Sequence, residues 1–521
     1  MTQSAFAVVD LFAGPGGLAE GFSSFVADDG SRPFKVVMSI EKDPIAHQTL
    51  RLRSFLRQFE GQLPDAYYDW IEQGGVQPDW SRLHPAQWRA ACEEAQNLTM
   101  GVAEDDATIV RKLAAIRRRY GDQTIVIGGP PCQAYSLVGR SRNKGKVDYV
   151  FEEDHRHELY KAYVNVLNRL RPAAFVMENV KGLLSSKANG DFLFHRVLTD
   201  LREAGGTGCG YRLISLGPDG SSTMDPAPSD FVIRAERHGI PQARHRLFII
   251  GVREDIAEAL DDITIEKAQL VEEPEATVRH VLAGLPRLRS GISRVDDNAE
   301  EWTAEVRNAL TELEKVRLTG PASRTAALKA SIVKAATALR SWNSTPCRSD
   351  RSLPSPVPEC ARELADWLYD PQLNALPNHE SRTHMPADLA RYAFAAVFGE
   401  AFGRSPKADE FPSELAPKHA NWRSGKFADR FKVQVWDAPS STVTSHIAKD
   451  GHYYIHPDPS QCRSLTVREA ARLQTFPDNY VFLGNRTQQY VQVGNAVAPL
   501  LARKIAKSLH ELIKKNDLHK Y

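Results

Sequence analysis

Short apolar runs alternate with helical patterns through the first 253 residues of the chain, and this alternation restricts the fold more than any other feature. The runs lie at residues 5–12, 34–41, 124–129, 173–180 and 246–253. Buried strands that alternate with helices are typical of a parallel, doubly wound sheet. The sequence therefore predicts an α/β fold with a Rossmann-like doubly wound sheet in this half of the chain.

The length of the chain predicts more than one domain. Its 521 residues are too many for one hydrophobic core and favour two or three domains. Residues 1–264 are predicted to form the α/β domain, with an insertion at about 51–95 that is rich in Trp, Tyr, Pro and Gln. The strand–helix alternation stops after this point. We expect a second, smaller domain over 265–486 and a C-terminal segment, 487–521, that returns to the first domain.

The composition excludes several classes of protein. The net charge of +1 neither indicates nor excludes nucleic acid, because binding needs only a local basic face. No apolar run approaches the roughly 18 residues of a membrane helix, and the N-terminus lacks the pattern of a signal peptide. The six cysteines form no C-x-x-C pair, and His379, His384, Cys347 and Cys360 match no zinc spacing. We expect a cytoplasmic protein without a metal.

A glycine-rich loop follows the first apolar run. Gly14-x-Gly16-x-x-Ala19 fits the dinucleotide fingerprint, and Glu41 ends the next run at the place of a ribose-binding acid. The glycines permit close approach to a ligand, and the carboxylate can accept both ribose hydroxyls. The pattern does not distinguish NAD from S-adenosylmethionine, and a plain glycine-rich turn is the alternative interpretation.

A cysteine and a second glutamate stand at the ends of two further runs. Cys132 follows 124–129 through Gly-Gly-Pro-Pro, and Glu178 lies near the end of 173–180. Sites in open α/β sheets form at the carboxyl ends of strands, so Glu41, Cys132 and Glu178 are expected to face one crevice. A lone cysteine is usually a small apolar residue. The shared edge instead favours nucleophilic catalysis coupled to group transfer.

Several longer motifs occur in a fixed order along the chain. They are "DLFAGPGG" from Asp10, "GGPPCQAYS" from Gly128, "ENV" from Glu178, "QARHR" from Gln242, "RSLTVREAARLQTFPDNY" from Arg463 and "QVGNAV" from Gln492. With these motifs the chain resembles the bacterial DNA cytosine-5 methyltransferases of restriction–modification systems. Residues 265–430 lie outside the resemblance, as expected for the variable target-recognition domain of that family. One departure is Val497-Ala498-Pro499, where members commonly read Val-Pro-Pro.

The resemblance implies a catalytic role for three residues. Cys132 would be the nucleophile that adds to C6 of cytosine. Glu178 would contact N3 and the exocyclic amine of the base, and Arg246 would bond its O2 side. Because these atoms are inaccessible in a duplex, the base would have to be flipped out of the DNA.

The resemblance also implies S-adenosyl-L-methionine as the cofactor, S-adenosyl-L-homocysteine as its product, and no metal. The acid that contacts the adenine in the family has only candidates here, Glu104, Asp105 and Asp106. The cofactor-binding residues implied by the motifs are Phe12, Ala13, Gly14, Gly16, Gly17, Leu18, Glu41, Pro130, Leu159, Asn495 and Val497.

Double-stranded DNA is the implied partner, and residues 138–148 suit a mobile basic lid. The arginines of the Arg463 motif and Glu469 are expected to brace the two domains through ion pairs. Asn378 and His379 are further candidates for reading bases. The predicted DNA-binding residues are Gln133, Ser136, Arg140, Arg142, Arg244, Arg348, Arg351 and Arg382.

The expected biological setting is a restriction–modification or defence system, with a cognate restriction endonuclease as a further partner. We expect a monomer in the bacterial cytoplasm, associated with the nucleoid and not with a membrane. The alternatives are a tRNA cytosine-5 methyltransferase, a DNA-binding regulator with a decayed site, and an NAD oxidoreductase. The DNA sequence that is recognised cannot be deduced from spacing.

Overall fold

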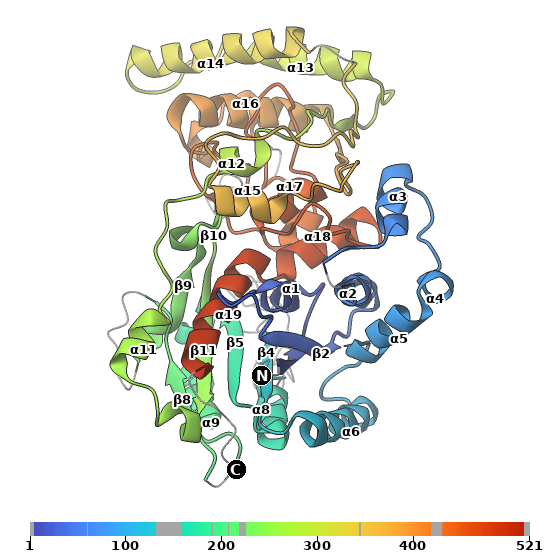
Figure 1. Ribbon diagram of the computed structural model, residues 1–521. Coiled ribbons are helices and arrows are strands. Elements are labelled where there is room, and N and C mark those ends of the chain that lie inside the picture. Colours follow the sequence, from blue (N-terminus) through green and yellow to red (C-terminus); the bar gives the residue numbers. More distant parts are fainter. Residues whose placement is uncertain are drawn as a thin grey trace.

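A computed structural model describes residues 5–59, 61–131, 159–188, 191–206, 208–217, 226–342, 345–417, 422 and 430–514. Figure 1 shows a central sheet in the lower part, helices around it, and a helical layer at the opposite end of the molecule. No helix among these described residues is long and apolar enough to cross a membrane.

The central sheet has the strand order β3-β2-β1-β4-β5-β11-β8, and β9 also pairs with β11. The pairs of β1 with β2 and β4, of β2 with β3, and of β4 with β5 are all parallel. The strands are β1 (Phe6–Leu11), β2 (Phe34–Ile40), β3 (Ala95–Gln96), β4 (Thr124–Gly128), β5 (Ala174–Val180), β8 (Tyr211–Ile214), β9 (Val232–Arg234) and β11 (His245–Arg253). The prediction of an α/β fold with a predominantly parallel sheet is confirmed.

The sheet departs from the prediction in one respect, because β11 runs antiparallel to β5, β8 and β9. A parallel neighbour needs a long crossover, whereas an antiparallel neighbour needs only a short connection. β11 follows β9 through the short 3-10 helix η5 (Ala235–His238) and the two-residue strand β10 (Gln242–Ala243). The chain therefore enters β11 at the edge of the sheet where β5 ends.

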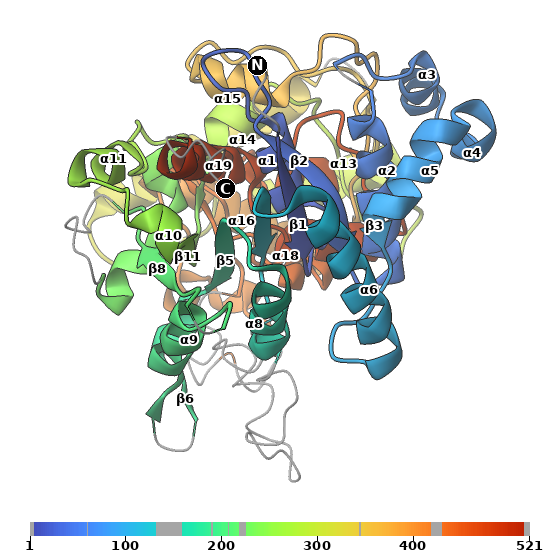
Figure 2. The same ribbon diagram turned by 60° about the horizontal axis from the view of Figure 1, so that its bottom comes forward.

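Helices cover both faces of the sheet, which explains its continuous apolar runs. One face carries α1 (Gly17–Ser24) and α19 (Pro499–Ile513). The other carries α6 (Ala103–Tyr120), α8 (Leu159–Leu170) and α9 (Leu193–Arg202), which Figure 2 shows along the same side of the molecule. The sheet and its edge therefore stand between two apolar layers.

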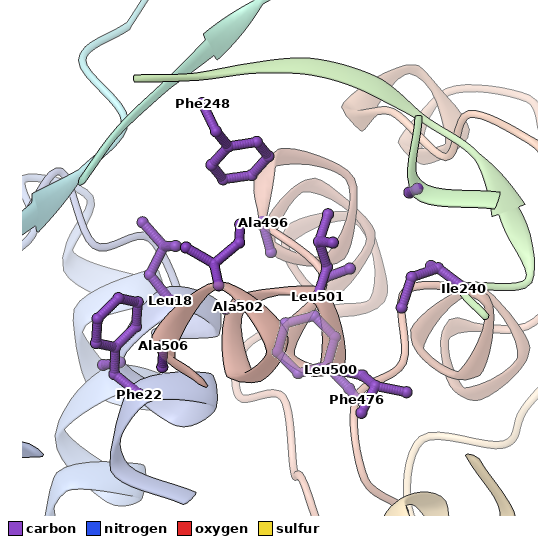
Figure 3. Close-up of a cluster of buried hydrophobic side chains, with 14 of the residues drawn as sticks. Leu18, Phe22, Ile240, Phe248, Phe476, Ala496, Leu500, Leu501, Ala502 and Ala506 are labelled. Carbon is purple, nitrogen blue, oxygen red and sulfur yellow. The ribbon is translucent and has the colours of Figure 1, made fainter. Parts of the chain in front are cut away.

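The last helix of the chain packs directly on the first. A Cβ added to Gly21 of α1 would collide with the side chain of Ala502 in α19, so glycine allows this close contact. Figure 3 shows Leu18 and Phe22 of α1 beside Ala502 and Ala506 of α19, with Phe248 of β11 above them. The residues that precede α19 are thereby brought to the loop that precedes α1.

The aromatic insertion begins later than predicted. Helix α2 (Pro44–Arg57) continues without interruption through residue 51, so the additional segment follows Arg57. It holds α3 (Asp65–Gln73), α4 (Trp80–Leu83) and α5 (Pro85–Glu94). Side chains of this segment share a buried cluster with Leu373 and Val481 from the second half of the chain.

The upper layer of Figure 1 has its own hydrophobic core. Helices α13 (Ala299–Leu313), α14 (Ala322–Arg340) and α16 (Pro386–Phe402) supply most of it. In contrast, α12 (Val278–Leu282), α15 (Arg362–Leu368), α17 (Val467–Leu473) and α18 (Arg486–Asn495) add buried residues to the core of the sheet domain. The independent core is thus narrower than the range 265–486.

Candidate active site

The structure brings Glu178 and Arg246 together at one edge of the sheet. In the pairing of β5 with β11, Glu178 lies opposite Phe248 and Arg246 opposite Val180, so the two side chains are diagonal neighbours on one face. Nε of Arg246 lies 3.1 Å from Oε1 of Glu178, and the two side chains are 15% and 14% exposed. A carboxylate and a guanidinium therefore meet in a largely desolvated position.

The chain that leads to Cys132 lies against this pair. A Cβ added to Gly129 would lie 2.9 Å from Oε2 of Glu178, which explains glycine at this position. The side-chain amide of Asn179 donates a 3.3 Å hydrogen bond to the carbonyl of Pro130. Pro131 is the last described residue before a gap that contains Cys132, Gln133, Ser136, Arg140 and Arg142. Their predicted roles lie outside the described residues.

The loop after β1 and Glu41 after β2 form a second part of the site. Phe12, Gly14 and Gly16 have φ angles of 57°, 58° and 104°, a left-handed backbone that is unusual for phenylalanine. The amide of Gly14 donates to Oε2 of Glu41 at 2.8 Å, and the amide of Asp43 donates to Oε1 at 2.7 Å. Burial raises the pKa of Glu41.

This loop has room for a ligand on one side only. Among the described residues, no atom lies within 4 Å of a Cβ added to Gly14, whereas a Cβ added to Gly17 would collide with the carbonyl oxygen of Val497. Each oxygen of Glu41 keeps a further lone pair after accepting one amide, so two hydroxyl groups can still bind. The loop and the carboxylate therefore fit an adenosyl ligand, the chemistry expected from the fingerprint.

The remaining predicted cofactor residues differ in their burial and in their position relative to this loop. Leu18 is buried and points toward Phe248 and Ala502 (Figure 3). Ala13 follows Phe12 and donates its amide to the carbonyl of Ile40. Asn495 ends α18, and Leu159 begins α8. Leu159 lies 3.8 Å from the position of a Cβ added to Gly101, beyond the end of β3.

Asn97 lies beside Glu41 and is a candidate that the sequence analysis missed. Its side-chain amide donates to the carbonyls of Glu41 and Lys42 at 2.8 and 3.1 Å, which leaves its side-chain oxygen as an acceptor beside the Glu41 loop. Two of the acids considered for the adenine contact have other partners. Asp105 accepts the amide of Thr99 and Asp106 that of Gly101. The preceding strand, β3, has only two residues and no detectable pattern.

Arg244, predicted to bind DNA, is buried in a joint between distant segments. It donates to the carbonyls of Val443 and Ala496 at 2.9 and 3.0 Å. β10, which precedes Arg244, also pairs with β14 (Ser440–Ser441). These contacts favour a bracing role for Arg244 in place of the predicted DNA contact.

The arginines predicted to read DNA in the second domain also have partners within the protein. Arg348 bonds Asp297 at 2.8 Å, and Arg351 donates to the carbonyl of Glu72. Arg382 donates to the carbonyls of Ile447 and Lys449 and lies 4.2 Å from the ring of Tyr490. Their contact with DNA stays a prediction, and the observed partners favour bracing.

Two further candidates for base reading are also engaged. His379 is 2% exposed and uses both ring nitrogens, toward Thr466 and the carbonyl of Pro286. Asn378 exchanges two hydrogen bonds with the backbone of Phe482. Contact of either side chain with a base stays a prediction. The described part of the chain contains no cluster of His, Cys, Asp or Glu that could hold a metal ion.

The charged residues of the Arg463 motif form buried ion pairs, but with each other, so bracing between the two domains stays a prediction. Arg463 and Glu469 form a fully buried pair with two hydrogen bonds, and Arg472 pairs with Asp478 in the same way. Arg468 instead donates to the carbonyls of Pro377, Pro477 and Tyr480. All of these partners lie between Pro377 and Tyr480, so the bonds brace this segment of the second half of the chain internally.

Comparison with known proteins gives a consistent result. A family model described as C-5 cytosine-specific DNA methylase matches residues 95–511. The chain is 32% identical to the type II methyltransferase M.Bpa9945I of Bacillus paralicheniformis over 97% of this chain and 99% of that protein. It is 27% identical to the type II methyltransferase M.AgeI of Thalassovita gelatinovora over 75% and 83% of the two chains. It is also 27% identical to the DNA (cytosine-5-)-methyltransferase M.ApeKI of Aeropyrum pernix over 75% and 82%.

Proposed function

The chain belongs to the C-5 cytosine-specific DNA methylase family, and on this premise we propose the full reaction of its site. The protein is a DNA (cytosine-5-)-methyltransferase of the type II restriction–modification class. The proposed reaction moves a methyl group from S-adenosylmethionine to C5 of a flipped-out cytosine in a specific duplex sequence. It proceeds through a covalent adduct with Cys132.

The observation that carries the proposal is the meeting of Glu178, Arg246 and the Gly129–Pro130 turn at the edge of the sheet. Cys132 is two residues beyond Pro130 in the sequence. Glu41 and the Gly14 loop stand at the ends of neighbouring strands. A base-binding pair and a ribose acid would therefore share one edge, with the nucleophile following the turn in the sequence.

The cofactor is assigned to the part of the site around Glu41. Glu41 would accept the ribose hydroxyls, and the side-chain oxygen of Asn97 would accept the adenine amino group. Phe12 would pack on the adenosyl group, and the open side of Gly14 leaves room for it. When bound, S-adenosylmethionine supplies an electrophilic methyl group, and the reaction needs no metal.

The chain's own residues would activate the cytosine. The Cys132 thiolate forms a bond to C6, which raises the electron density at C5. Glu178 stabilises the ring through N3 and the exocyclic amine, and Arg246 donates to O2, where negative charge develops. Once C5 carries the methyl group, loss of its proton lets the C6–S bond break and restores the thiolate.

DNA would lie between the sheet domain and the helical upper layer, which we assign as the target-recognition domain. The segment 138–148, outside the described residues, would close over the flipped base. The enzyme would work as a monomer in the bacterial cytoplasm near the nucleoid, alongside a cognate restriction endonuclease. The family and the restriction–modification relatives support DNA as the substrate in this assignment.

Bisulfite sequencing of DNA from cells that express the chain tests the proposal and also gives the site. We expect methylated cytosines at one recurring sequence with the wild type and none with Cys132→Ala. Methylation of tRNA alone would favour the tRNA alternative, and DNA binding without methylation would favour a regulator. Either result would remove the proposed reaction.

A further inference from the structure

Three basic residues end up at one level of the sheet although they come from three separate segments. His245 lies directly opposite Arg234 in the pairing of β11 with β9. On the other side of β11, Arg246 lies opposite Val180, and Lys181 is the next residue beyond that last pair. His245 and Arg234 are therefore neighbours on adjacent strands, about 4.8 Å apart. Lys181 follows Val180 at the same edge and begins the short 3-10 helix η3 (Lys181–Ser185). We call Lys181, His245 and Arg234 the basic row.

The basic row is accessible to solvent and positively charged. Lys181 and Arg234 are exposed, and the His245 side chain is 37% exposed. Glu236 pairs with His245, with Oε1 of Glu236 2.6 Å from Nε2 of His245. Only 14% of the Glu236 side chain is exposed. Within the described residues, neither Lys181 nor Arg234 forms an ion pair. Two permanent positive charges therefore face solvent against one largely covered carboxylate.

The position of the row beside the catalytic pair suggests what it binds. His245 immediately precedes Arg246, and Lys181 follows Glu178 by three residues, so all of them lie at the same end of β5 and β11. Figure 1 shows β5, β9 and β11 on the same side of the sheet domain. Successive strand residues point to opposite faces of the sheet, so His245 and Arg246 lie on different faces at the same edge. A base that enters beside Glu178 brings its own sugar–phosphate chain to this edge.

We propose that the basic row grips the backbone phosphates next to the target cytosine. This inference rests on the proposed function and adds a phosphate-binding surface to it. An exposed lysine acts as a point charge, whereas arginine offers a planar fork, and both suit phosphate oxygens. Contacts of this kind fix the position of the DNA without reading its sequence. They therefore contribute a binding term that depends strongly on salt.

Salt-dependent binding of the full chain to a duplex that contains its methylation site tests the row. Dissociation constants are measured in the presence of S-adenosylhomocysteine at several salt concentrations, for the wild type, Lys181→Gln, Arg234→Gln and the double variant. Each lost phosphate contact should lower the slope of log Kd against log[salt] by about 0.9. At 0.1 M salt the loss of each phosphate contact should raise the dissociation constant by roughly five- to tenfold.

Arg118→Gln is the matched control. Arg118 is exposed on α6 near its end, which precedes β4 and so lies at the opposite edge of the sheet. This variant loses the same charge and should keep the slope of the wild type. Unchanged affinity for S-adenosylhomocysteine shows that the row variants are folded.

Two results would overturn the row while leaving the methyltransferase assignment intact. In the first, the wild type methylates DNA but the double variant has the same slope of log Kd against log[salt] as the wild type. The other is an equal loss of slope in Arg118→Gln, which would indicate a general effect of net charge. A wild type that transfers no methyl group to DNA would instead contradict the proposed function itself.

Discussion

Arg246 and Glu178 form an ion pair across two strands that run in opposite directions, with Nε 3.1 Å from Oε1. The antiparallel pairing of β11 with β5 sets this distance, so the pair exists before any base is bound. The arginine holds the carboxylate at the edge of the sheet, beside the turn that precedes Cys132. A base placed beside the pair would meet a preorganised acceptor and donor, which is the arrangement that stabilises developing charge most effectively.

Glu178→Gln should bind cofactor normally and transfer methyl groups slowly. The amide cannot carry the charge that stabilises a protonated cytosine ring, and a loss of about 10²- to 10⁴-fold is typical when such a group is removed. Transfer of labelled methyl groups under single-turnover conditions measures this. Glu203→Gln, at an exposed position beyond α9, is the control. A Glu178→Gln enzyme as fast as the control would rule out the assigned role.

Cys132→Ala should bind DNA but form no covalent complex with it. Only a thiolate at this position can make the C6 bond. Duplex containing 5-fluorocytosine should trap the wild type as a complex that survives denaturing electrophoresis. Cys347→Ala, which removes an exposed thiol in another part of the chain, should be trapped like the wild type. Trapping of Cys132→Ala would show that another residue is the nucleophile.

Glu41→Ala should weaken binding of S-adenosylhomocysteine by about 1.5 to 3 kcal/mol, the range for a hydrogen bond to a charged group. Its carboxylate is already fixed by the amides of Gly14 and Asp43, so little ordering is needed when the ligand binds. Asn97→Ala should weaken it as well, through the adenine. Calorimetry with S-adenosylhomocysteine and NAD measures both effects. Binding of NAD alone would contradict the cofactor assignment, and unchanged affinity in Asn97→Ala would remove that residue from the site.

The sequence predicted the groups at the ends of parallel strands better than any other part of the site. Apolar runs end next to Glu41 and Glu178, and parallel strands bring such ends to one edge without further information. The ion pair of Glu178 with Arg246 was not predictable in this detail, because it depends on the antiparallel direction of β11. That direction follows from β9 and β10, which are too short to leave a pattern.

The arginines show a second limit of prediction from sequence. Arg244 was predicted to contact DNA from its place in the "QARHR" motif, and Arg348 and Arg382 from their polar loops. Each bonds protein groups, and for Arg244 and Arg382 these are carbonyls of segments far away in the chain. The partners are backbone atoms, which every residue has, so no sequence pattern marks them. The ion pairing of the Arg463 motif was easier to anticipate, because the acidic partner Glu469 is only six residues further along the chain.

Because His379 is held neutral in the folded protein, it should lower the free energy of unfolding in mild acid. Burial lowers the pKa of His379 to about 4, whereas an unfolded histidine has a pKa of about 6.5. Nδ1 of His379 accepts a hydrogen bond from the Thr466 hydroxyl, and the oxygen of that hydroxyl accepts one from the amide of Glu469. A proton added to Nδ1 would therefore point at another hydrogen-bond donor. Above pH 6.5 neither state binds the proton, and the stabilisation is fully present. As the pH falls from 6.5 toward 4 only the unfolded state binds it, and stability is lost.

The measurable consequence is a flatter pH dependence in His379→Gln. Between pH 7.5 and 5.0 this histidine should account for about 2 kcal/mol of the loss in unfolding free energy. Urea unfolding at both pH values, for the wild type and the variant, gives the difference. His195→Gln, at an exposed position on α9, should keep the full dependence. An identical pH dependence in the wild type and His379→Gln would show that His379 titrates normally.

The helical upper layer should determine which DNA sequence is methylated. The sheet domain is occupied by the cofactor and the flipped cytosine, and discrimination among all four base pairs requires a surface against the major groove. The separate core of this layer uses residues between Ile292 and Cys462, although α15 and Val443 within this range pack into the core of the sheet domain. An exchange of residues 290–462 for those of a relative with a known site keeps α12 and α17 in the core of the sheet domain, whereas the broader range 265–486 would replace both. The chimera should methylate the relative's site, and bisulfite sequencing reports it.

An exchange of residues 61–94 is the control, since this segment packs beside Leu373 and Val481 and should leave the site unchanged. A folded chimera of the first kind that still methylates the original site would place sequence recognition elsewhere in the chain.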